Sequence, residues 1–176
     1  MEKSSTGAGS SSAAPPASGR PRAAPVAIAL GSNLGDRQSH LAFAVAKLSE
    51  FVDDLRVSSI YETEPVGVGD QPRFLNAAVA GYTAESPQQV LRRLLDIERE
   101  RGRERPFPGA PRTLDLDLIF YADQIIDEPG LRVPHPRFRE RRFVLEPLAE
   151  IVGEWMDPEG GKTVEELFRE IRKRPG

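Results

Sequence analysis

Apolar residues recur along the chain at two spacings, one typical of strands and one typical of helices. Short apolar runs predict strands at residues 26–30, 57–63, 74–83 and 114–121, followed by two shorter strands at residues 124–127 and 131–133. Apolar positions three and four residues apart predict helices at residues 36–51 and between Ser86 and Gly102. Two further helices are expected at residues 139–151 and 163–172.

The starts of two helices are marked by capping residues. Ser86 and Gln89 form a capping box, in which each side chain bonds the backbone N–H of the other residue, and Thr163 and Glu166 repeat this spacing. Gly102 is suited to end the first of these helices. The positions of both helices therefore follow from local sequence.

The order strand, helix, strand, strand, helix, strand predicts an α+β fold. It is the order of a ferredoxin-like βαββαβ sandwich with a mostly antiparallel sheet, here with additional C-terminal strands and helices. Residues 26–176 are expected to form this single domain. Residues 1–25 are mostly Ser, Ala, Pro and Gly, which predicts a disordered tail, with an organelle transit peptide as the alternative.

Composition excludes several classes of protein. The 176 residues include no cysteine, which excludes thiol catalysis, cysteine-bound metal centres and a disulfide scaffold. No apolar run approaches the roughly 18 residues of a membrane span, and no apolar signal segment is found. A formal charge of −3 argues against a nucleic-acid partner. We therefore expect a cytoplasmic protein that binds neither membranes nor nucleic acid.

Two aspartates provide the clearest chemical signal. On the predicted strand, Asp115 and Asp117 project from one face, while the opposite face carries Leu114, Leu116, Leu118 and Phe120. Two neighbouring carboxylates repel each other, and a hard divalent cation such as Mg²⁺ relieves that repulsion. The same spacing also occurs on ordinary exposed strands. The surrounding residues therefore decide whether this pair is interpreted as a cation site.

Arginines surround this acidic pair on both sides in the sequence. They are Arg92, Arg93, Arg99, Arg101, Arg103, Arg105 and Arg112 before it, and Arg132, Arg137, Arg139, Arg141 and Arg142 after it. Guanidinium groups bind phosphate oxygens in a bidentate manner. Arg99 and Arg101 alternate with Glu98, Glu100 and Glu104, as in a solvated helix end. Arg103, Arg105 and Arg112 lie in a proline-rich loop beside the carboxylates, where phosphate binding is favoured.

Phe74 and Asn76 share one face of another predicted strand. An aromatic ring and an amide suit a flat heteroaromatic ligand, although a core phenylalanine beside a turn-forming asparagine is an equal alternative. The backbone of residues 63–67 is placed to line the same site. His135 lies between two prolines beside arginines, where it is suited to contact a phosphate or nucleotide, whereas His40 is expected at the surface.

Taken in order, these motifs resemble the family of 6-hydroxymethyl-7,8-dihydropterin pyrophosphokinases over residues 26–152. The motifs that carry the resemblance are residues 29–36 (ALGSNLGD), 63–67 (TEPVG), 71–77 (QPRFLNA), 102–103 (GR), 111–117 (PRTLDLD) and 133–137 (VPHPR). The resemblance implies a ferredoxin-like monomer that transfers the diphosphate of ATP to the hydroxymethyl oxygen of the pterin and releases AMP. It also implies two Mg²⁺ ions and a place in folate biosynthesis.

The resemblance implies a role for each matching residue. Asp115 and Asp117 would hold the Mg²⁺ ions, and Arg103 and Arg112 would act with them in catalysis. ATP would be contacted by Arg105, His135 and Arg141. The pterin would be contacted by Thr63, Glu64, Val66, Phe74, Asn76 and Phe143.

Two alternatives belong to other classes, namely a non-catalytic nucleotide- or RNA-binding module and a metal-dependent phosphohydrolase. The acidic net charge disfavours the first, and the predicted ring site disfavours the second. The chain departs from the family at one place. Many members carry an aromatic residue and glycine before the PRT motif, where this chain has Gly109 and Ala110, with Phe107 displaced. We expect this change to alter closure of the loop.

Overall fold

The computed structural model describes residues 23–64, 73–102 and 113–174. The described elements are β2 (Ala24–Ser32), α1 (Arg37–Leu48), β3 (Asp53–Val57), β4 (Tyr61–Thr63), β5 (Phe74–Thr83), α2 (Pro87–Glu100), β6 (Asp115–Tyr121), β7 (Ile126–Glu128), β8 (Leu131–Val133), the 3₁₀ helix η2 (Phe138–Glu140), α3 (Arg142–Val152) and α4 (Val164–Arg172). Residues 1–22 of the predicted tail lie outside the described residues.

The main sheet has the strand order β3-β5-β2-β6, and β4 also pairs with β5. Each of these pairings is antiparallel, as is that between β7 and β8 in a separate hairpin. The predicted α+β fold with an antiparallel sheet is therefore confirmed. β6 stands at one end of this path and β3 at the other.

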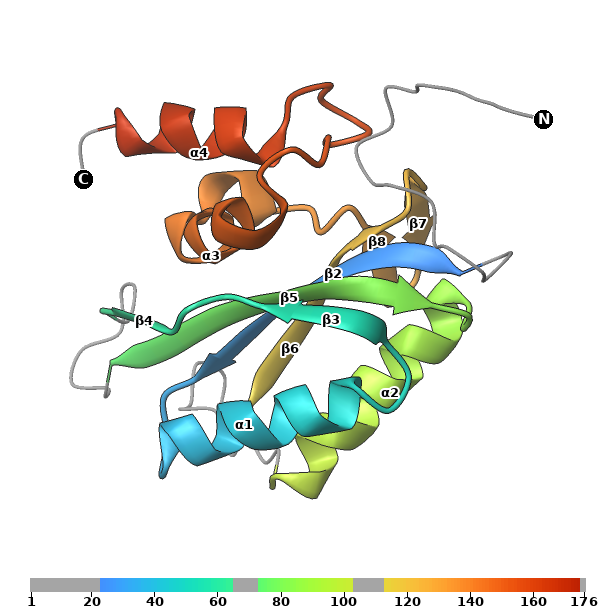
Figure 1. Ribbon diagram of the computed structural model, residues 1–176, viewed down its shortest axis with the longest axis vertical. Helices are drawn as coiled ribbons and strands as arrows, with labels where there is room; N and C mark the ends of the chain where they lie inside the picture. Colours follow the sequence, from blue (N-terminus) through green and yellow to red (C-terminus); the bar gives the residue numbers. More distant parts are fainter. Residues whose placement is uncertain (1–22, 65–72, 103–112, 175–176) are drawn as a thin grey trace.

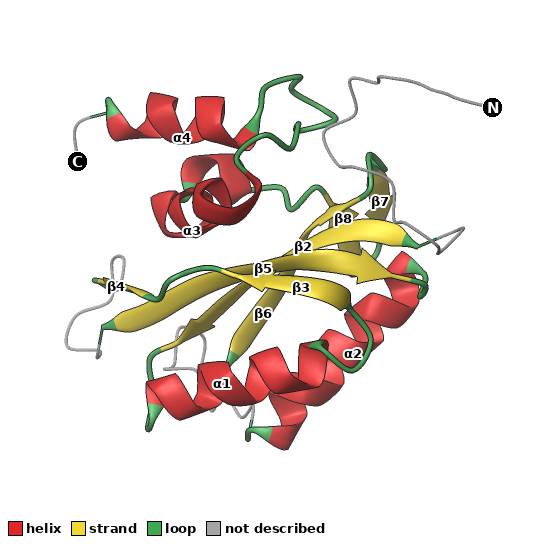
Figure 2. Cartoon of the chain, in the orientation of Figure 1, coloured by secondary structure: helices red, strands yellow, loops and turns green. Residues whose placement is uncertain are grey.

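Helices cover both faces of the sheet (Figures 1 and 2). Alternation along β2 explains this, because successive side chains point to opposite faces. Ile28 and Leu30 join the core cluster that includes residues of α1 and α2, whereas Ala27 and Ala29 join the cluster that includes residues of α3 and α4. The small alanines allow α3 to pack close to the central strands. No described helix is long and apolar enough to cross a membrane.

The alternation along β6 changes at a β-bulge. Leu114, Leu116 and Leu118 face α1 and α2 as predicted, but Phe120 packs in the opposite cluster. The expectation that Phe120 shares the face of the leucines is therefore wrong. The register against β2 shifts at this point, which leaves Ile119 as an extra residue and reverses the sides that follow it.

The strand predicted at residues 57–63 contains β4 and only the last residue of β3, whose residues 53–56 were not predicted as a strand. Both pair with β5, but Ser58 interrupts the ladder because its Oγ accepts the Ala78 N–H at 2.8 Å. Ser59 donates its N–H to Glu150 of α3 at 3.0 Å. A hydrogen bond to a side chain and a hydrogen bond to α3 thus replace regular pairing over these residues.

The capping boxes of α2 and α4 are present as predicted. The helix expected at residues 139–151 is shorter at its start. It begins with η2, and the extended backbone of Arg141 then separates η2 from α3.

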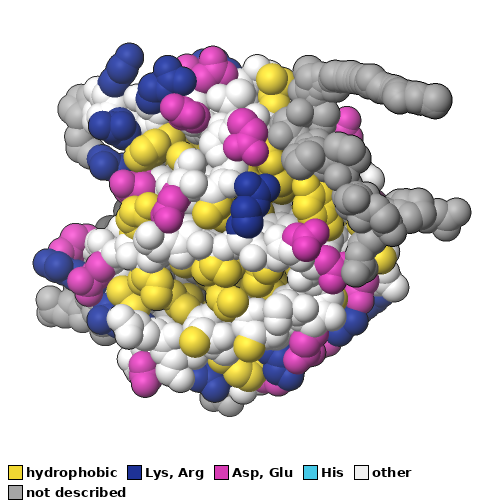
Figure 3. All heavy atoms as spheres, viewed as in Figure 1, with side chains coloured by type: hydrophobic (Ala, Val, Ile, Leu, Met, Phe, Trp, Pro, Cys, Tyr) yellow, Lys and Arg dark blue, Asp and Glu magenta, His cyan; other side chains and the backbone are white. Residues whose placement is uncertain are grey.

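The β3 side of the sheet is partly apolar at its surface. Val57 and Ile60 are 45% and 47% exposed. Figure 3 shows hydrophobic side chains at the surface between the two helical layers on the face in view. This edge is at the opposite end of the strand order from β6, so it is separate from the acidic pair.

Candidate active site

One row of residues crosses three strands on the sheet face that α3 covers. In the strand register, Gly31 of β2 lies opposite Asn76 of β5 on one side and opposite Asp115 of β6 on the other. Since neighbouring strands lie about 4.8 Å apart, the amide and the carboxylate start roughly 10 Å from each other. The two sites predicted from separate motifs are therefore on one face.

The centre of this row is kept open by a glycine. A Cβ atom at Gly31 would lie 3.3 Å from Oδ1 of Asn76 and 3.8 Å from Cδ1 of Phe74. Asn76 and Phe74 thus approach β2 closely over Gly31. The next row on the same face is also small, with Ala78 opposite Ala29. A flat ligand fits such a surface better than a bulky one.

The structure brings together Thr63, Phe74 and Asn76 of the predicted ring site. Asn76 is buried, and its Nδ2 donates a 2.6 Å hydrogen bond to Oγ1 of Thr63. This bond fixes the amide and leaves Oδ1 and the second N–H for a ligand. Phe74 is half-buried beside it and pairs with Thr63 in the ladder.

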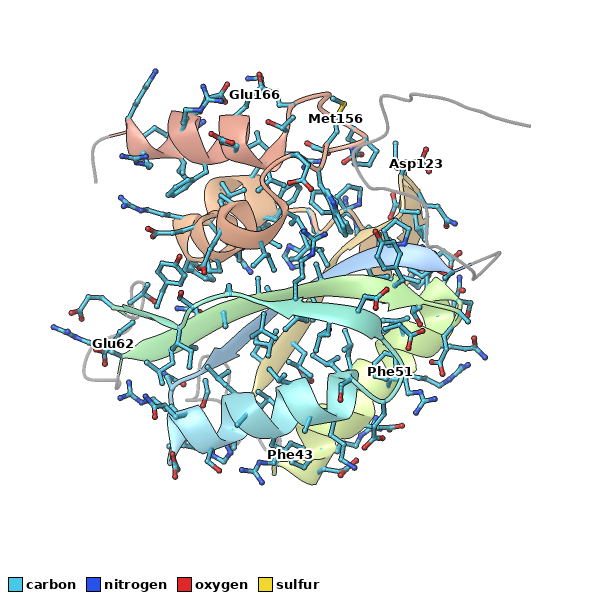
Figure 4. All side chains as sticks on the ribbon, viewed as in Figure 1. Phe43, Phe51, Glu62, Asp123, Met156 and Glu166 are labelled. Atoms are coloured by element: carbon cyan, nitrogen blue, oxygen red, sulfur yellow. The ribbon has the colours of Figure 1, made fainter. Side chains whose placement is uncertain are left out.

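Glu64 lies at the outer end of this strand pair. Its carboxylate forms a 2.8 Å ion pair with Arg73, and both side chains are exposed. Its neighbour on β4, Glu62, points outward at the end of the sheet (Figure 4) and pairs with Arg37 at 3.2 Å. The Glu64 side chain is thus engaged at the surface, which leaves its backbone as the part suited to the ring site.

Asp115 and Asp117 project from the face that carries Gly31 and Ala29. Both are half-buried, and their Cα atoms are roughly 7 Å apart along the strand. The described residues contain no group of three or more His, Asp or Glu side chains able to hold a metal. Two carboxylates are the donor set that suits Mg²⁺, since this ion takes its remaining ligands from water and substrate phosphate. The residues present therefore fit the predicted cation.

His135 is fixed beside the acidic strand. Its backbone N–H donates to the carbonyl of Ile119 at 3.1 Å, at the bulge of β6. Burial and the neighbouring Arg141 lower the pKa of His135, while Asp115 opposes this shift. Its Nδ1 accepts the Arg137 N–H at 3.2 Å, so the neutral ring carries its proton on Nε2 and is a hydrogen-bond donor there.

Arg141 and Phe143 meet at the start of α3. The Arg141 guanidinium lies 5.7 Å from the centroid of the Phe143 ring, and it forms no ion pair within the described part of the chain. Phe143 is half-buried against the cluster that includes Ala29 and Ala78. The helix start therefore presents one cation and one aromatic ring to the site face.

Most other arginines named as phosphate candidates are paired elsewhere. Side-chain ion pairs hold Arg93 to Glu85, Arg99 to Asp96, Arg132 to Asp127, Arg139 to Asp157 and Arg142 to Glu146. Arg101 bonds Nδ1 of His40 at 3.0 Å and stacks on Phe43, which is labelled in Figure 4. His40 is thus half-buried rather than at the surface.

Sequence reasoning missed one residue beside the acidic pair. The alternating charges of residues 98–104 predict a solvated helix end, but Glu98 is 3% exposed and accepts the Leu116 N–H at 2.7 Å. The available signal was its spacing of four residues from Leu94 on the buried side of α2. Some predicted residues lie outside the described ones, namely Val66, Arg103, Arg105, Phe107, Gly109, Ala110 and Arg112.

An antiparallel α+β domain with two carboxylates, a histidine donor and an arginine that forms no ion pair with the described residues has the features of an enzyme acting on phosphorylated substrates. Residues 27–153 match the family of 7,8-dihydro-6-hydroxymethylpterin-pyrophosphokinases (HPPK). The chain therefore belongs to this family, and the predicted class of enzyme, a pyrophosphokinase of folate biosynthesis, is confirmed at the level of the family. The alternative of a non-catalytic binding module is not favoured.

Relatives agree with this assignment. The chain is 51% identical over 126 residues to the 2-amino-4-hydroxy-6-hydroxymethyldihydropteridine pyrophosphokinase of Bacillus subtilis, covering 70% of this chain and 75% of that protein. It is 41% identical to the folic acid synthesis protein fol1 of Pneumocystis carinii, covering 83% of this chain but 20% of that protein.

A solved structure shows the same fold. The wild-type HPPK-DHPS of Plasmodium falciparum aligns with a TM-score of 0.67 at 14% identity, over 84% of this chain and 44% of that chain. The chain thus spans less than half of this longer protein and a fifth of the Pneumocystis protein.

Proposed function

We propose that this chain transfers the β,γ-diphosphate of ATP to the hydroxymethyl oxygen of 6-hydroxymethyl-7,8-dihydropterin. The pterin oxygen attacks the β-phosphorus, the bond from that phosphorus to the oxygen bridging the α-phosphate breaks, and AMP leaves with that oxygen. The hydroxyl proton of the pterin is released. Both substrates react directly, without a covalent enzyme intermediate.

The row formed by Asn76, Gly31 and Asp115 is the observation that carries this proposal. It supports a ring bound at one side of the sheet face and charged phosphates at the other. The separation of roughly 10 Å allows a pterin to lie over Gly31 with its hydroxymethyl group directed at the acidic pair. A phosphohydrolase uses water as the acceptor, so it would not need a binding site for a ring.

The acidic side would bind the triphosphate. Asp115 and Asp117 would hold two Mg²⁺ ions, which supply charge neutralisation when bound. His135 would donate its Nε2–H and Arg141 its guanidinium to phosphate oxygens, where such charge-assisted bonds are strong. Arg105 is proposed to contact ATP with them. Arg103 and Arg112 are proposed to stabilise the charge that develops during transfer.

The ring side would orient the pterin. Phe74 and Phe143 would enclose its two faces, and the fixed Asn76 amide would bond its edge, with one N–H already committed to Thr63. The backbone of Thr63, Glu64 and Val66 would complete the contacts. Holding both reactants in this geometry is itself catalytic, because it replaces a bimolecular encounter.

We also propose that the sheet and helices adopt the ferredoxin-like arrangement, which the strand order β3-β5-β2-β6 supports. A monomeric state and a cytoplasmic location stay predictions from the sequence. Size-exclusion chromatography with light scattering tests the first.

The proposed activity is tested by incubating the protein with Mg²⁺ and ATP, with and without 6-hydroxymethyl-7,8-dihydropterin. AMP that forms only with the pterin is the expected result. ADP and phosphate formed from ATP alone would instead indicate a phosphohydrolase. Binding of both substrates without AMP would refute the proposed transfer by this chain.

A further inference from the structure

Glu98 is buried beside the acidic strand although it lies in the last turn of α2. Its side chain is 3% exposed, and the helix ends two residues later at Glu100. Burial of a carboxylate costs free energy unless it is hydrogen-bonded. The C-terminal end of a helix also carries partial negative charge, which disfavours a carboxylate there. A residue that opposes two local preferences is expected mainly at functional sites.

Glu98 contacts β6 between the two aspartates. Its Oε2 accepts a 2.7 Å hydrogen bond from the backbone N–H of Leu116, the residue that separates Asp115 from Asp117. β6 ends the described strand path, so its outer edge is not paired with another strand of the main sheet. Glu98 therefore takes the place of a ladder partner for this N–H.

Asp115 and Asp117, on either side of Leu116, are held at the edge of β6 that pairs with β2. Leu116 registers with Leu30 of β2, and hydrogen-bonded and non-hydrogen-bonded pairs alternate along an antiparallel ladder. Because the Leu116 N–H points outward to Glu98, the backbone groups of Asp115 and Asp117 point inward to β2. The short segment that carries both carboxylates is thus held from its two edges.

We propose that Glu98 is a positioning residue that sets the separation and direction of the Asp115 and Asp117 carboxylates through the backbone. The inference rests on the proposed metal-binding role of this pair. In this role Glu98 would act through the backbone of β6 and not by contact with a substrate. Residues that orient metal ligands commonly change metal affinity by about 10–100-fold when removed, and this is the scale expected here.

The test compares Glu98→Ala with Glu98→Gln. The dissociation constant of Mn²⁺, used as a probe for Mg²⁺, is measured by electron paramagnetic resonance with a non-hydrolysable ATP analogue present. Glu98→Ala removes the acceptor and is expected to raise this constant by about 10–100-fold. Glu98→Gln keeps a side-chain oxygen that accepts the Leu116 N–H, so its constant is expected to stay near that of the wild type.

A second readout needs no metal. Amide hydrogen exchange at Leu116, followed by NMR, is expected to be faster in Glu98→Ala than in the wild type, and slow again in Glu98→Gln. Leu94→Ala is the matched control, because Leu94 lies one turn earlier on the same helix and is 1% exposed. It is expected to lower stability to urea without changing the Mn²⁺ constant.

Three results would overturn the inference. They are an unchanged Mn²⁺ constant in folded Glu98→Ala, an equal loss of affinity in Glu98→Gln, and an equal loss in Leu94→Ala. Absence of Mn²⁺ binding by the wild type would refute the metal role of the pair and this inference with it. Diphosphate transfer is scored separately, by pterin-dependent AMP from the wild type, so the two failures are distinguishable.

Discussion

Gly31 lies directly opposite Asn76 in the ladder between β2 and β5, and a Cβ atom at Gly31 would stand 3.3 Å from Oδ1 of the Asn76 side chain. This distance is shorter than an ordinary van der Waals contact. The absence of a side chain at Gly31 therefore leaves the amide in the position fixed by its hydrogen bond to Thr63. Space for a ring over β2 depends on this one glycine.

We predict that Gly31→Ala weakens pterin binding about tenfold, because the new methyl group displaces the Asn76 amide and costs roughly one charge-neutral hydrogen bond. Affinity for ATP is expected to change little. Isothermal titration of each substrate separates the two effects. Equal losses for both substrates would show that the substitution distorts the sheet instead.

Ser32→Ala is the matched control. Ser32 follows Gly31 on the same strand, is fully buried and points to the opposite face by alternation. Its hydroxyl has no hydrogen-bond partner among the described residues. Pterin affinity in this variant is expected to equal that of the wild type.

Local sequence was sufficient to predict some parts of the fold and site. The capping boxes at Ser86 and Thr163 depend on residues three positions apart, and both are present. The shared face of Asp115 and Asp117 needs only the alternation of a strand. Features of this kind are determined within one element.

Other parts depend on residues far apart in sequence. The row through Gly31 follows from strand register, which is set by packing and not by any one strand. The burial of Glu98 depends on its bond to Leu116, 18 residues away. Phe120 lies on the opposite face of the sheet from Leu118 because of a bulge formed against β2. The register and the bulge have no local signature, so Phe120 was predicted incorrectly. Glu98 had a local signal in its spacing of four residues from Leu94, but the alternating charges around it favoured a solvated position.

Asp117→Ala is predicted to abolish metal-dependent AMP formation and to leave the protein folded, since this half-buried side chain lies on the site face and not in the apolar core. Chelation of Mg²⁺ is expected to have the same effect in the wild type and to be reversed by added Mg²⁺. Asp123→Asn serves as control, because Asp123 is exposed beyond the other end of β6 (Figure 4). Turnover by Asp117→Ala at the wild-type rate would contradict the assigned role.

Arg141→Ala is predicted to weaken ATP binding by roughly 10–100-fold, the scale of a lost hydrogen bond to a charged group. The neighbouring Arg142 is already paired with Glu146 at 3.6 Å and is exposed. Because such surface pairs contribute little, Arg142→Ala is expected to change ATP affinity less than twofold. Titration of ATP into both variants gives the comparison, and equal effects would remove Arg141 from the phosphate site.

Asp157 is predicted to stabilise the protein in a pH-dependent way. Burial by itself raises the pKa of its carboxyl group, but bonds from Arg139 and from the backbone of Glu159 and Gly160 outweigh burial and hold the pKa below its usual value. The Arg139 Nη2 donates to Oδ1 at 2.8 Å, and the Asp157 side chain is 0% exposed. Breaking such a buried pair costs about 3 kcal/mol.

The direction of the pH dependence follows from the lowered pKa of the Asp157 carboxyl group. The carboxylate contributes its full stability above the unfolded-state pKa of about 3.9, and this contribution is lost as the pH falls through the lower folded-state value. Asp157→Asn should therefore be less stable than the wild type at pH 7, with a difference that narrows below about pH 4. Urea unfolding at pH 7, 4 and 3 measures it. Glu159→Gln, which alters the exposed partner of the same arginine, should cost less than about 1 kcal/mol. A difference for Asp157→Asn that stays constant down to pH 3 would contradict the role of its charge.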